Sequence, residues 1–385
     1  MSQLSYMEKL LDGVEVEWRE LGEVCRFING RAYKQSELLE KGKYPVLRVG
    51  NFFTNNHWYY SDLELDEDKY CDNGDLLYAW SASFGPRIWQ EGKVIYHYHI
   101  WKVIPNTEIV KKKYLFYLLD WDTEALKAEQ STGSTMKHIG KGLIEKRMLP
   151  IPPLKVQTEI VRILDTFTEL TAELTAELTA RQQQYAYYRE QLLTFEEGDV
   201  EWKTLGDIAE NLDSKRKPIS SSLREPGDIP YYGASGIVDY VKDYIFDGDY
   251  LLVSEDGANL VARSTPIAFS ISGKNWVNNH AHVLKFETYA ERKYIEYFLN
   301  SIDLTPYISG AAQPKLNQKN LNSIKIPNPS LKEKERIVSI LDKFDALTTS
   351  LTEGLPREIE LRQQQYEYYR DLLLSFPKSE VVAHD

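Results

Sequence analysis

The chain has 385 residues, of which 42% are hydrophobic and 27% charged, so the sequence predicts two or three folded domains and excludes a disordered tail. It has no run of 18 apolar residues, no signal-peptide pattern and only two cysteines, so we expect a cytoplasmic protein without a membrane span, disulfide framework or four-thiolate zinc site. The net charge of −12 argues against nucleic acid as a binding partner. However, residues 26–150 carry 18 basic and 16 acidic side chains, and residues 205–330 carry 13 basic and 15 acidic ones. Both blocks are thus nearly neutral, and each can present a local basic face.

An internal duplication organises the sequence. Three segments recur in the same order, and the residues between them match only at scattered positions. The pairs are Val16–Glu23 with Val200–Asp207, Ile160–Phe167 with Ile337–Phe344, and Arg181–Arg189 with Arg362–Arg370. We therefore expect two similar frames that carry dissimilar interiors.

The predicted elements follow this duplication along the chain. Residues 1–153 predict a first mixed α/β domain of short strands with a closing helix near 113–119, ended by the prolines of 150–153. Residues 198–330 predict the second domain, with its helix near 293–299. Residues 154–197 and 331–385 predict two long amphipathic helices that pair antiparallel. The predicted fold class is thus α+β, with two domains related by a pseudo-twofold duplication and joined by two helical spacers.

The central spacer contains a tandem repeat, Thr171-Ala172-Glu173-Leu174 followed by Thr175-Ala176-Glu177-Leu178. A helix over residues 154–195 is about 60 Å long, and each four-residue repeat adds about 6 Å to it. The second spacer is interrupted by Gly354-Leu355-Pro356, where we expect a kink or a restart because proline removes a backbone hydrogen bond.

Catalytic motifs are missing from the sequence, including the phosphate-binding loop, a dinucleotide-binding glycine pattern and H-E-x-x-H. The best metal candidates are His97-Tyr98-His99 and His280-Ala281-His282, since alternation on a strand places both imidazoles of a pair on one face. A metal-dependent hydrolase built on these pairs stays as one alternative, but we expect packed or hydrogen-bonding histidines and no metal.

Polar loops that combine small residues with long donors are typical of DNA-binding proteins, because small residues let the backbone approach while Arg, Lys, Asn and Gln contact phosphates or base edges. Each loop is equally compatible with an ordinary turn. The candidate DNA-contacting residues are Arg48, Asn51, Ser81, Ser83, Phe84, Arg87, His99 and Lys137 in the first half, and Tyr231, Ser235, Asn259, Arg263, Asn279, His280, Gln313, Lys315 and Asn317 in the second.

Taken together, the duplicated entry segments, the proline-rich exits, the repeated Arg-Gln-Gln-Gln-Tyr segments and the Thr-Ala-Glu-Leu tandem resemble the DNA-specificity subunits of type I restriction-modification systems over nearly the full length. The resemblance implies two target-recognition domains that each recognise one part of a split DNA site. It also implies a non-catalytic chain that binds double-stranded DNA, two adenine-N6 methyltransferase subunits and restriction/translocase subunits. S-adenosylmethionine, ATP and Mg²⁺ would then belong to those partners, and this chain would hold no cofactor.

The competing interpretation is a scaffold of two aromatic-rich domains that binds carbohydrate or peptide and has no role on DNA. The acidic net charge favours this interpretation, whereas the tandem and the duplicated frame oppose it. The sequence does not identify the bases that either domain contacts, because base-edge contacts depend on docking geometry.

Overall fold

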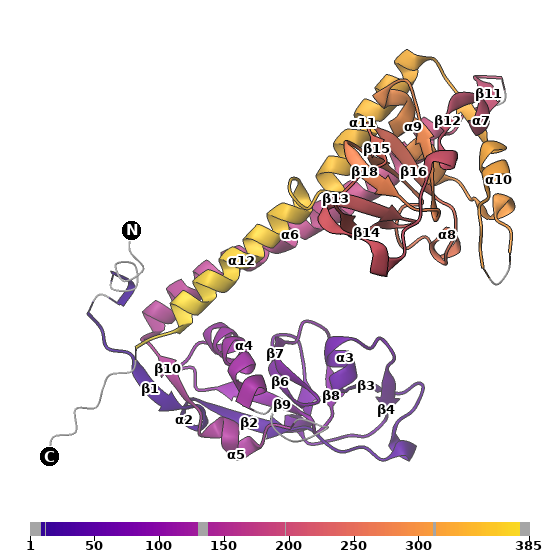
Figure 1. The fold of residues 1–385 in the computed structure, drawn as a ribbon. Helices are drawn as coiled ribbons and strands as arrows, with labels where there is room; N and C mark the ends of the chain where they lie inside the picture. Colours follow the sequence, from indigo (N-terminus) through magenta and orange to yellow (C-terminus); the bar gives the residue numbers. More distant parts are fainter. Residues whose placement is uncertain (1–8, 12, 130–137, 197, 311–312, 378–385) are drawn as a thin grey trace. The chain divides into compact units, whose positions relative to one another are not determined.

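The computed structural model describes residues 9–11, 13–129, 138–196, 198–310 and 313–377. The chain divides into two compact units, which are described separately below (Figure 1). Unit 1 comprises Met1–Glu173 and Ile359–Asp385, and unit 2 comprises Leu174–Glu358. The boundary crosses the long helix α6 (Leu154–Leu193) inside the Thr-Ala-Glu-Leu tandem. The domain boundaries proposed from the sequence at residues 153, 197 and 330 stay predictions.

Unit 1 contains two four-stranded sheets and a two-stranded ribbon. The first sheet has the strand order β2-β9-β6-β7, the second has the order β4-β3-β8-β5, and β1 pairs with β10. Its strands are β1 (Glu17–Glu20), β2 (Cys25–Asn29), β3 (Tyr44–Leu47), β4 (Tyr59–Ser61), β5 (Tyr70–Cys71), β6 (Leu76–Ser81), β7 (Ser83–Ile88), β8 (Val94–Tyr96), β9 (Ile100–Pro105) and β10 (Met148–Ile151). Its shorter helices are α2 (Leu21–Val24), α3 (Val49–Phe53), α4 (Lys112–Glu129) and α5 (Lys141–Glu145).

Unit 2 repeats this architecture. Its sheets have the orders β12-β19-β16-β17 and β14-β13-β18-β15, and β11 pairs with β20. Its strands are β11 (Glu201–Thr204), β12 (Glu210–Asn211), β13 (Pro226–Gly233), β14 (Gly236–Val241), β15 (Phe246–Asp247), β16 (Tyr250–Ser254), β17 (Ala268–Ile271), β18 (Lys274–Val277), β19 (Ala281–Lys285) and β20 (Lys325–Asn328). Its shorter helices are α7 (Leu205–Ile208), α8 (Asn259–Ala262), α9 (Tyr289–Ser301) and α10 (Gln318–Asn322).

The two interiors share one topology, although the sequence comparison finds only scattered matches between them. Each strand of unit 1 has a counterpart at the same place in the strand order of unit 2, and β3 pairs parallel to β8 as β13 does to β18. The insertions differ, because α3 follows β3 in unit 1 whereas α8 follows β16 in unit 2. A strand order can persist while side chains change, since the ladder is made by backbone hydrogen bonds. The predicted duplication of the two domains is therefore confirmed for the backbone, and the dissimilarity seen in the sequence lies in the side chains and insertions.

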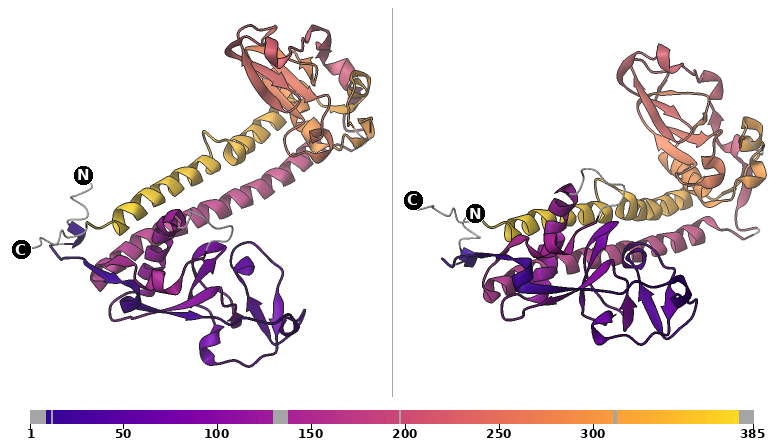
Figure 2. Two further views of the ribbon diagram at one scale, coloured as in Figure 1. Left: turned by 60° about the horizontal axis from the view of Figure 1, so that its bottom comes forward. Right: turned by 90° about the horizontal axis from the view of Figure 1, so that it is seen from below.

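The predicted spacer helices are present. Helix α6 is one unbroken helix that contains the whole tandem, Thr171–Leu178 (Figure 2). The C-terminal spacer consists of α11 (Leu331–Thr349) and α12 (Leu355–Leu374), and Pro356 lies in the first turn of α12. The expected restart is thus confirmed at the position where proline is tolerated.

Aromatic stacking pairs the spacer helices within each unit. In unit 1, Phe167 of α6 stacks on Tyr369 of α12 with ring centroids 5.3 Å apart. In unit 2, Tyr185 and Tyr188 of α6 stack on Phe344 of α11 at 5.9 and 5.6 Å. The partner residue numbers fall as those of α6 rise, as expected for the predicted antiparallel pairing.

Equivalent hydrogen bonds attach the spacers to the sheet-covering helices. In unit 1, the Tyr117 hydroxyl of α4 donates to Asp165 of α6 over 2.7 Å. In unit 2, the Tyr297 hydroxyl of α9 donates to Asp342 of α11 over 2.6 Å. Asp165 and Asp342 occupy the same position of the repeated Ile-Leu-Asp segment, so the duplicated frame carries a duplicated contact. Among the residues described, no helix is long and apolar enough to span a membrane.

Candidate nucleic-acid interface

Three segments that are distant in the sequence meet at one edge of unit 1. The backbone nitrogen of Trp80 at the end of β6 donates to the carbonyl of His99 over 3.1 Å, and the nitrogen of Ile139 donates to the carbonyl of Trp80 over 3.0 Å. An isolated bridge pairs Ser81 with His138. We call the six residues at this meeting point the first junction: Trp80, Ser81, Tyr98, His99, Trp101 and His138.

Unit 2 builds the same meeting point with the same backbone bonds. The nitrogen of Glu255 donates to the carbonyl of His280 over 2.9 Å, and the nitrogen of Leu316 donates to the carbonyl of Glu255 over 2.8 Å. An isolated bridge pairs Asp256 with Lys315. By strand register, the equivalent six residues form the second junction: Glu255, Asp256, Asn279, His280, His282 and Lys315.

Aromatic rings fill the first junction. Trp80 stacks on the buried Trp101 with centroids 5.5 Å apart, and its indole nitrogen donates to the carbonyl of Tyr98 over 2.9 Å. The rings of His99 and His138 lie 5.0 and 5.8 Å from the Trp80 ring. Because Trp80 is fixed by its stacking on Trp101, the two imidazoles are held around a rigid indole.

Burial lowers the pKa of two neighbouring histidines, His99 of the first junction and the adjacent His97. Burial, helped by the nearby charges of His99 and Arg48, lowers the pKa of His97 to about 4. Burial and the proximity of His138 also lower the pKa of His99. A neutral imidazole has one donor and one acceptor nitrogen, so these side chains offer hydrogen bonds without charge near neutral pH.

A lysine–glutamate ion pair and two histidine–carboxylate hydrogen bonds fill the second junction. Lys315 pairs with Glu255 over 3.0 Å, and His280 pairs with Asp256 over 2.9 Å. Next to them, the fully buried His282 places Nδ1 2.6 Å from Asp213 and Nε2 2.7 Å from the carbonyl of Leu316. The backbone position that carries the stacked Trp101 in unit 1 thus carries a histidine hydrogen-bonded to a carboxylate in unit 2.

Two buried carboxylates stay ionised, that of Glu255 in the second junction and that of the nearby Asp213. Although burial raises the pKa of Glu255, hydrogen bonds from Arg216 and Lys315 lower it more, and the net pKa is below the usual range. Burial likewise raises the pKa of Asp213, but the hydrogen bond and charge of His282 and the amide of Val283 bring it below the usual range. Arg216 lies 2.6 Å from Glu255, so it balances this acid together with Lys315.

Asp213, Glu255 and His282 could in principle hold a metal ion, since their ligand atoms lie within 4.8 Å of one another. Each donor is already engaged, however, because Arg216 and Lys315 contact Glu255 and both nitrogens of His282 face protein oxygens. We therefore interpret the cluster as a structural ion network and assign no metal to it.

Strained backbone occurs beside the first junction and in the segment between β16 and β17 of unit 2. In the part of the chain that the structure describes, two non-glycine residues have positive φ, namely Ala82 at 65° and Arg263 at 48°. Ala82 forms the turn between β6 and β7, and Arg263 lies between the equivalent strands β16 and β17. Strain of this kind tends to gather at functional sites, where the surrounding structure maintains it.

Known proteins identify the family of these two units. The family model described as the type I restriction modification DNA specificity domain matches this chain twice, at residues 13–181 and 197–361. The chain belongs to this family. The specificity subunit of the type I restriction enzyme EcoR124I/EcoR124II of Escherichia coli is 37% identical to it over all of both chains. A putative type I specificity subunit of Haemophilus influenzae is 34% identical over 97% of this chain and 98% of its own. The family resemblance seen in the sequence is thereby confirmed, as is the DNA-specificity role that the family carries.

Solved structures support the fold. The type I restriction-modification S subunit from M. genitalium has a TM-score of 0.62 at 16% identity, covering 95% of this chain and 98% of its own. A second solved structure comes from work on complex assembly and conformational transition of the type I R-M system. Its chain has a TM-score of 0.56 at 16% identity, covering 94% of this chain and 98% of its own. The predicted α+β class with two similar domains is therefore confirmed.

Five of the DNA-contacting residues proposed for this specificity subunit lie at the junctions. Ser81 and His99 belong to the first, and Asn279, His280 and Lys315 belong to the second. Two more, Arg48 and Ser235, lie close by. The charge of Arg48 acts on His97, which directly precedes Tyr98 and His99 of the first junction. Ser235 lies in the β13–β14 turn, where the carbonyl of Ala234 accepts a hydrogen bond from the hydroxyl of Ser254, directly before Glu255 of the second junction. The structure thus brings together residues that the sequence placed in separate loops.

Other proposed residues have structural contacts in this specificity subunit. The side-chain oxygens of Asn259 and Asn317 accept backbone N–H groups of Thr265 and Asn320, both at 3.0 Å. Two further side chains bond to loop carbonyls: Asn51 to His57 over 2.7 Å, and Arg87 to Phe52 over 2.6 Å.

The side chains of Phe84 and Tyr231 are buried, at 6% and 1% exposure, so they offer little surface to DNA. Ser83 and Gln313 are exposed, and Lys137 lies outside the described residues.

The two His-x-His elements are not equivalent, which corrects the expectation that each alternates along one strand. In the first element, His97 forms an isolated bridge with Arg31, and His99 lies in the turn before β9. In the second, His280 lies in the turn before β19 and His282 lies within that strand. The imidazoles of a pair are therefore not placed on one face of one strand.

Strand register gives the true correspondence between the two halves. His99 matches His280, whereas His282 within β19 matches Trp101. Sequence reasoning missed Trp80 and Trp101 as members of the first junction and Asp256 as a member of the second, because the signal is the shared strand register rather than a motif.

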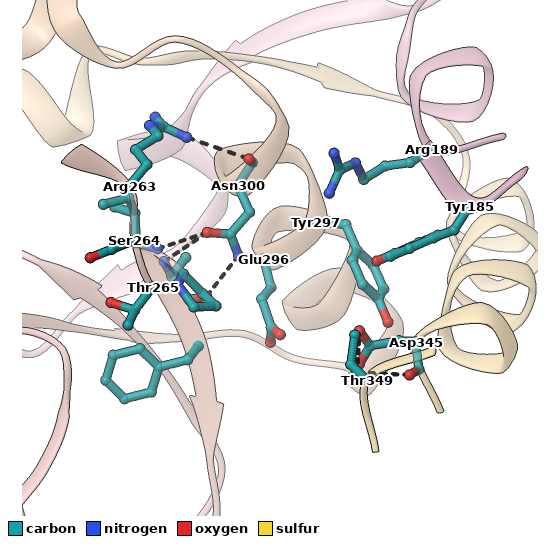
Figure 3. Close-up of a pocket in the computed structure, with 14 residues that line it drawn as sticks. Tyr185, Arg189, Arg263, Ser264, Thr265, Glu296, Tyr297, Asn300, Asp345 and Thr349 are labelled. Atoms are coloured by element: carbon teal, nitrogen blue, oxygen red, sulfur yellow. Dashed lines mark hydrogen bonds between the residues drawn. The ribbon is translucent and has the colours of Figure 1, made fainter. Parts of the chain in front are cut away.

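A separate pocket lies in unit 2 and has a volume of about 470 Å³ (Figure 3). Arg189 and Arg263 line it, and Arg263 donates to the backbone carbonyl of Asn300 over 3.4 Å while its Nη2 is buried without a hydrogen-bond partner. The Asn300 side chain is hydrogen-bonded to the backbone of Ile267 and Ala268. Arg263 is the one proposed contact residue that lines this pocket, so we place the interface at the junctions instead.

Replacing Asp213 with Asn should destabilise unit 2 by about 3–5 kcal/mol, because a buried ion pair loses one partner. The pKa values of Asp213 and Glu255 are lowered in the folded state, so their stabilising effect is complete above the unfolded-state values of about 4 and is lost as the pH falls through the lower folded-state values. Urea unfolding between about pH 3 and pH 7 measures both effects. The exposed Asp228→Asn serves as the control, and an Asp213→Asn variant as stable as this control at neutral pH would contradict the role given to the network.

Proposed function

We propose that this chain recognises a bipartite, asymmetric DNA sequence and directs partner subunits to it. Each unit would contact one half-site, and the base pairs between the half-sites would be left without base contacts. The observation that carries the proposal is the duplicated strand topology of two units that share one continuous helix, in a chain matched twice by the DNA-specificity family. Two units with one backbone and different side chains suit two different half-sites.

Helix α6 would set the number of base pairs between the half-sites. Its tandem adds about 6 Å and about 40° of net rotation for every four residues, against about 3.4 Å per base pair of DNA. The unit boundary falls between Glu173 and Leu174, so a change in tandem length acts between the two units. Recognition and spacing would then be separate properties of one chain.

The proposed partners are two adenine-N6 methyltransferase subunits and, for restriction, ATP-dependent translocase subunits. S-adenosylmethionine, ATP and Mg²⁺ would be used by those subunits, and this chain would contribute recognition without catalysis. The partner subunits can supply basic surface and share the phosphate contacts with this chain. Such sharing would explain how a chain of net charge −12 binds DNA.

Co-purification with the methyltransferase subunits, followed by DNA-binding assays at several salt concentrations, tests this function. We expect a stable complex that prefers DNA containing its site over unrelated DNA and loses affinity steeply as salt rises. A chain that forms no such complex, or a complex that binds all DNA equally, would favour the carbohydrate- or peptide-binding scaffold instead.

A further inference from the structure

We infer that the first and second junctions are the base-recognition centres of the two units, and that the second contacts a G·C pair through Asp256 and Lys315 while the first recognises its bases through the aromatic Trp80–His99–His138 group. This inference rests on the proposed function and specifies where and by what chemistry each half-site is recognised.

The two junctions are built in the same way. In each unit, the junction joins three segments through matching backbone hydrogen bonds. These segments are the end of β6 or its equivalent β16, the turn before β9 or β19, and the segment before α5 or α10. The scaffold is constant, yet five of the equivalent positions change chemical class: Trp80 to Glu255, Ser81 to Asp256, Tyr98 to Asn279, Trp101 to His282 and His138 to Lys315. A site whose backbone is kept and whose side chains vary is suited to recognising different sequences.

The second junction exposes the side chains of a lysine, an aspartate and a histidine. The side chains of Lys315, His280 and Asp256 are 50%, 51% and 31% exposed, so they can exchange their present contacts for contacts with DNA. When Lys315 turns to DNA, the buried Glu255 keeps Arg216 as its partner, so no buried charge is left alone.

The chemistry of this pair fits one base pair. Lysine donates to O6 and N7 of guanine, and an aspartate accepts the N4 amino group of cytosine. Because Asp256 and Lys315 are bridged across neighbouring backbone segments, they can address the two bases of one pair.

The first junction offers stacking and neutral hydrogen bonds instead. Trp80 is fixed by Trp101, and His99 and His138 lie beside its ring. The pKa of His99 is lowered by burial, and its neutral imidazole can donate to one base atom and accept from another without adding a charge that would favour phosphate over base. The strained turn at Ala82 directly follows Ser81, as expected for a loop whose shape is maintained for contact.

Mapping of methylated adenines by the complex of this chain with its methyltransferase subunits tests the inference. We expect Asp256→Asn and Lys315→Ala to relax the preference for one G·C pair by about 5- to 100-fold in one half-site, leaving the other half-site and the gap unchanged. Lys315→Arg should keep the guanine preference, because arginine contacts the same O6 and N7 atoms. His99→Ala and His138→Ala should relax only the other half-site.

Matched controls are Lys127→Ala on α4 and Lys242→Ala directly after β14, which remove exposed lysines away from the junctions and should leave every base preference as in the wild type. If wild-type protein maps to a two-part site while the junction variants keep all preferences, the inference is overturned and the proposed function stands. A junction variant that weakens both half-sites equally would also overturn it, since that result marks a structural role. A wild type without a two-part site defeats the proposed function itself.

Discussion

Deleting Thr171–Leu174 is expected to change the gap between the two half-sites while leaving both half-site sequences intact. The deletion removes one four-residue unit from the exposed centre of α6, where Leu174 is only half-buried, so the helix can close without loss of a core residue. The shortening of about 6 Å and the rotation of about 40° correspond to one or two base pairs of DNA in rise and twist. Methylation mapping of the variant complex measures the new gap.

The expected loss on the original site is large. A complex whose second unit no longer faces its half-site forfeits those base contacts, and each lost base pair costs about 1–3 kcal/mol. Methylation of the original sequence should therefore fall by at least about 30-fold when two base pairs are lost. The control is Ala172→Ser, which keeps the length of α6 and should keep the gap. Altered half-site bases with an unchanged gap would contradict this role of the helix.

Exchanging residues 26–150 for the corresponding block of another family member is expected to replace one half-site completely and to leave the other half-site unchanged. Residues 26–150 lie within unit 1, whose core contacts α6 and α12 through residues outside the block, such as Leu164 and Leu373. The Tyr117–Asp165 hydrogen bond crosses the block boundary, so the donor block must keep a tyrosine at this position of α4.

Exchange of residues 205–330 is the reciprocal control, and it should replace the other half-site alone. Mapping both chimaeras against the wild type distinguishes the two units directly. A chimaera that changes bases in both half-sites, or that changes the gap, would show that recognition is not divided between the units as proposed.

The frame of this fold could be predicted from the sequence because it follows local rules. The apolar spacing from Leu164 to Leu192 predicts α6 nearly to its ends, and Pro356 marks the restart at α12. The repeated Ile-Leu-Asp segment also placed Asp165 and Asp342 at equivalent positions, where the structure shows equivalent hydrogen bonds to Tyr117 and Tyr297.

The candidate site could be predicted only in pieces. His99 and His280 were found by residue type, but the His-x-His pattern does not show that they occupy equivalent positions, because strand register is a property of the folded backbone. The network around His282 could not be predicted for the same reason, since Asp213 lies 69 residues away in the sequence. Long-range pairing brings these residues together, and a local pattern does not report it.

Mapping all methylated adenines produced by the wild-type chain with its methyltransferase subunits tests the central claim most directly. The account predicts a single asymmetric sequence in two parts, with a fixed number of unspecified base pairs between them. A continuous recognition sequence, or two parts separated by a variable number of base pairs, would contradict a specificity subunit in which one helix sets the spacing of two recognition units.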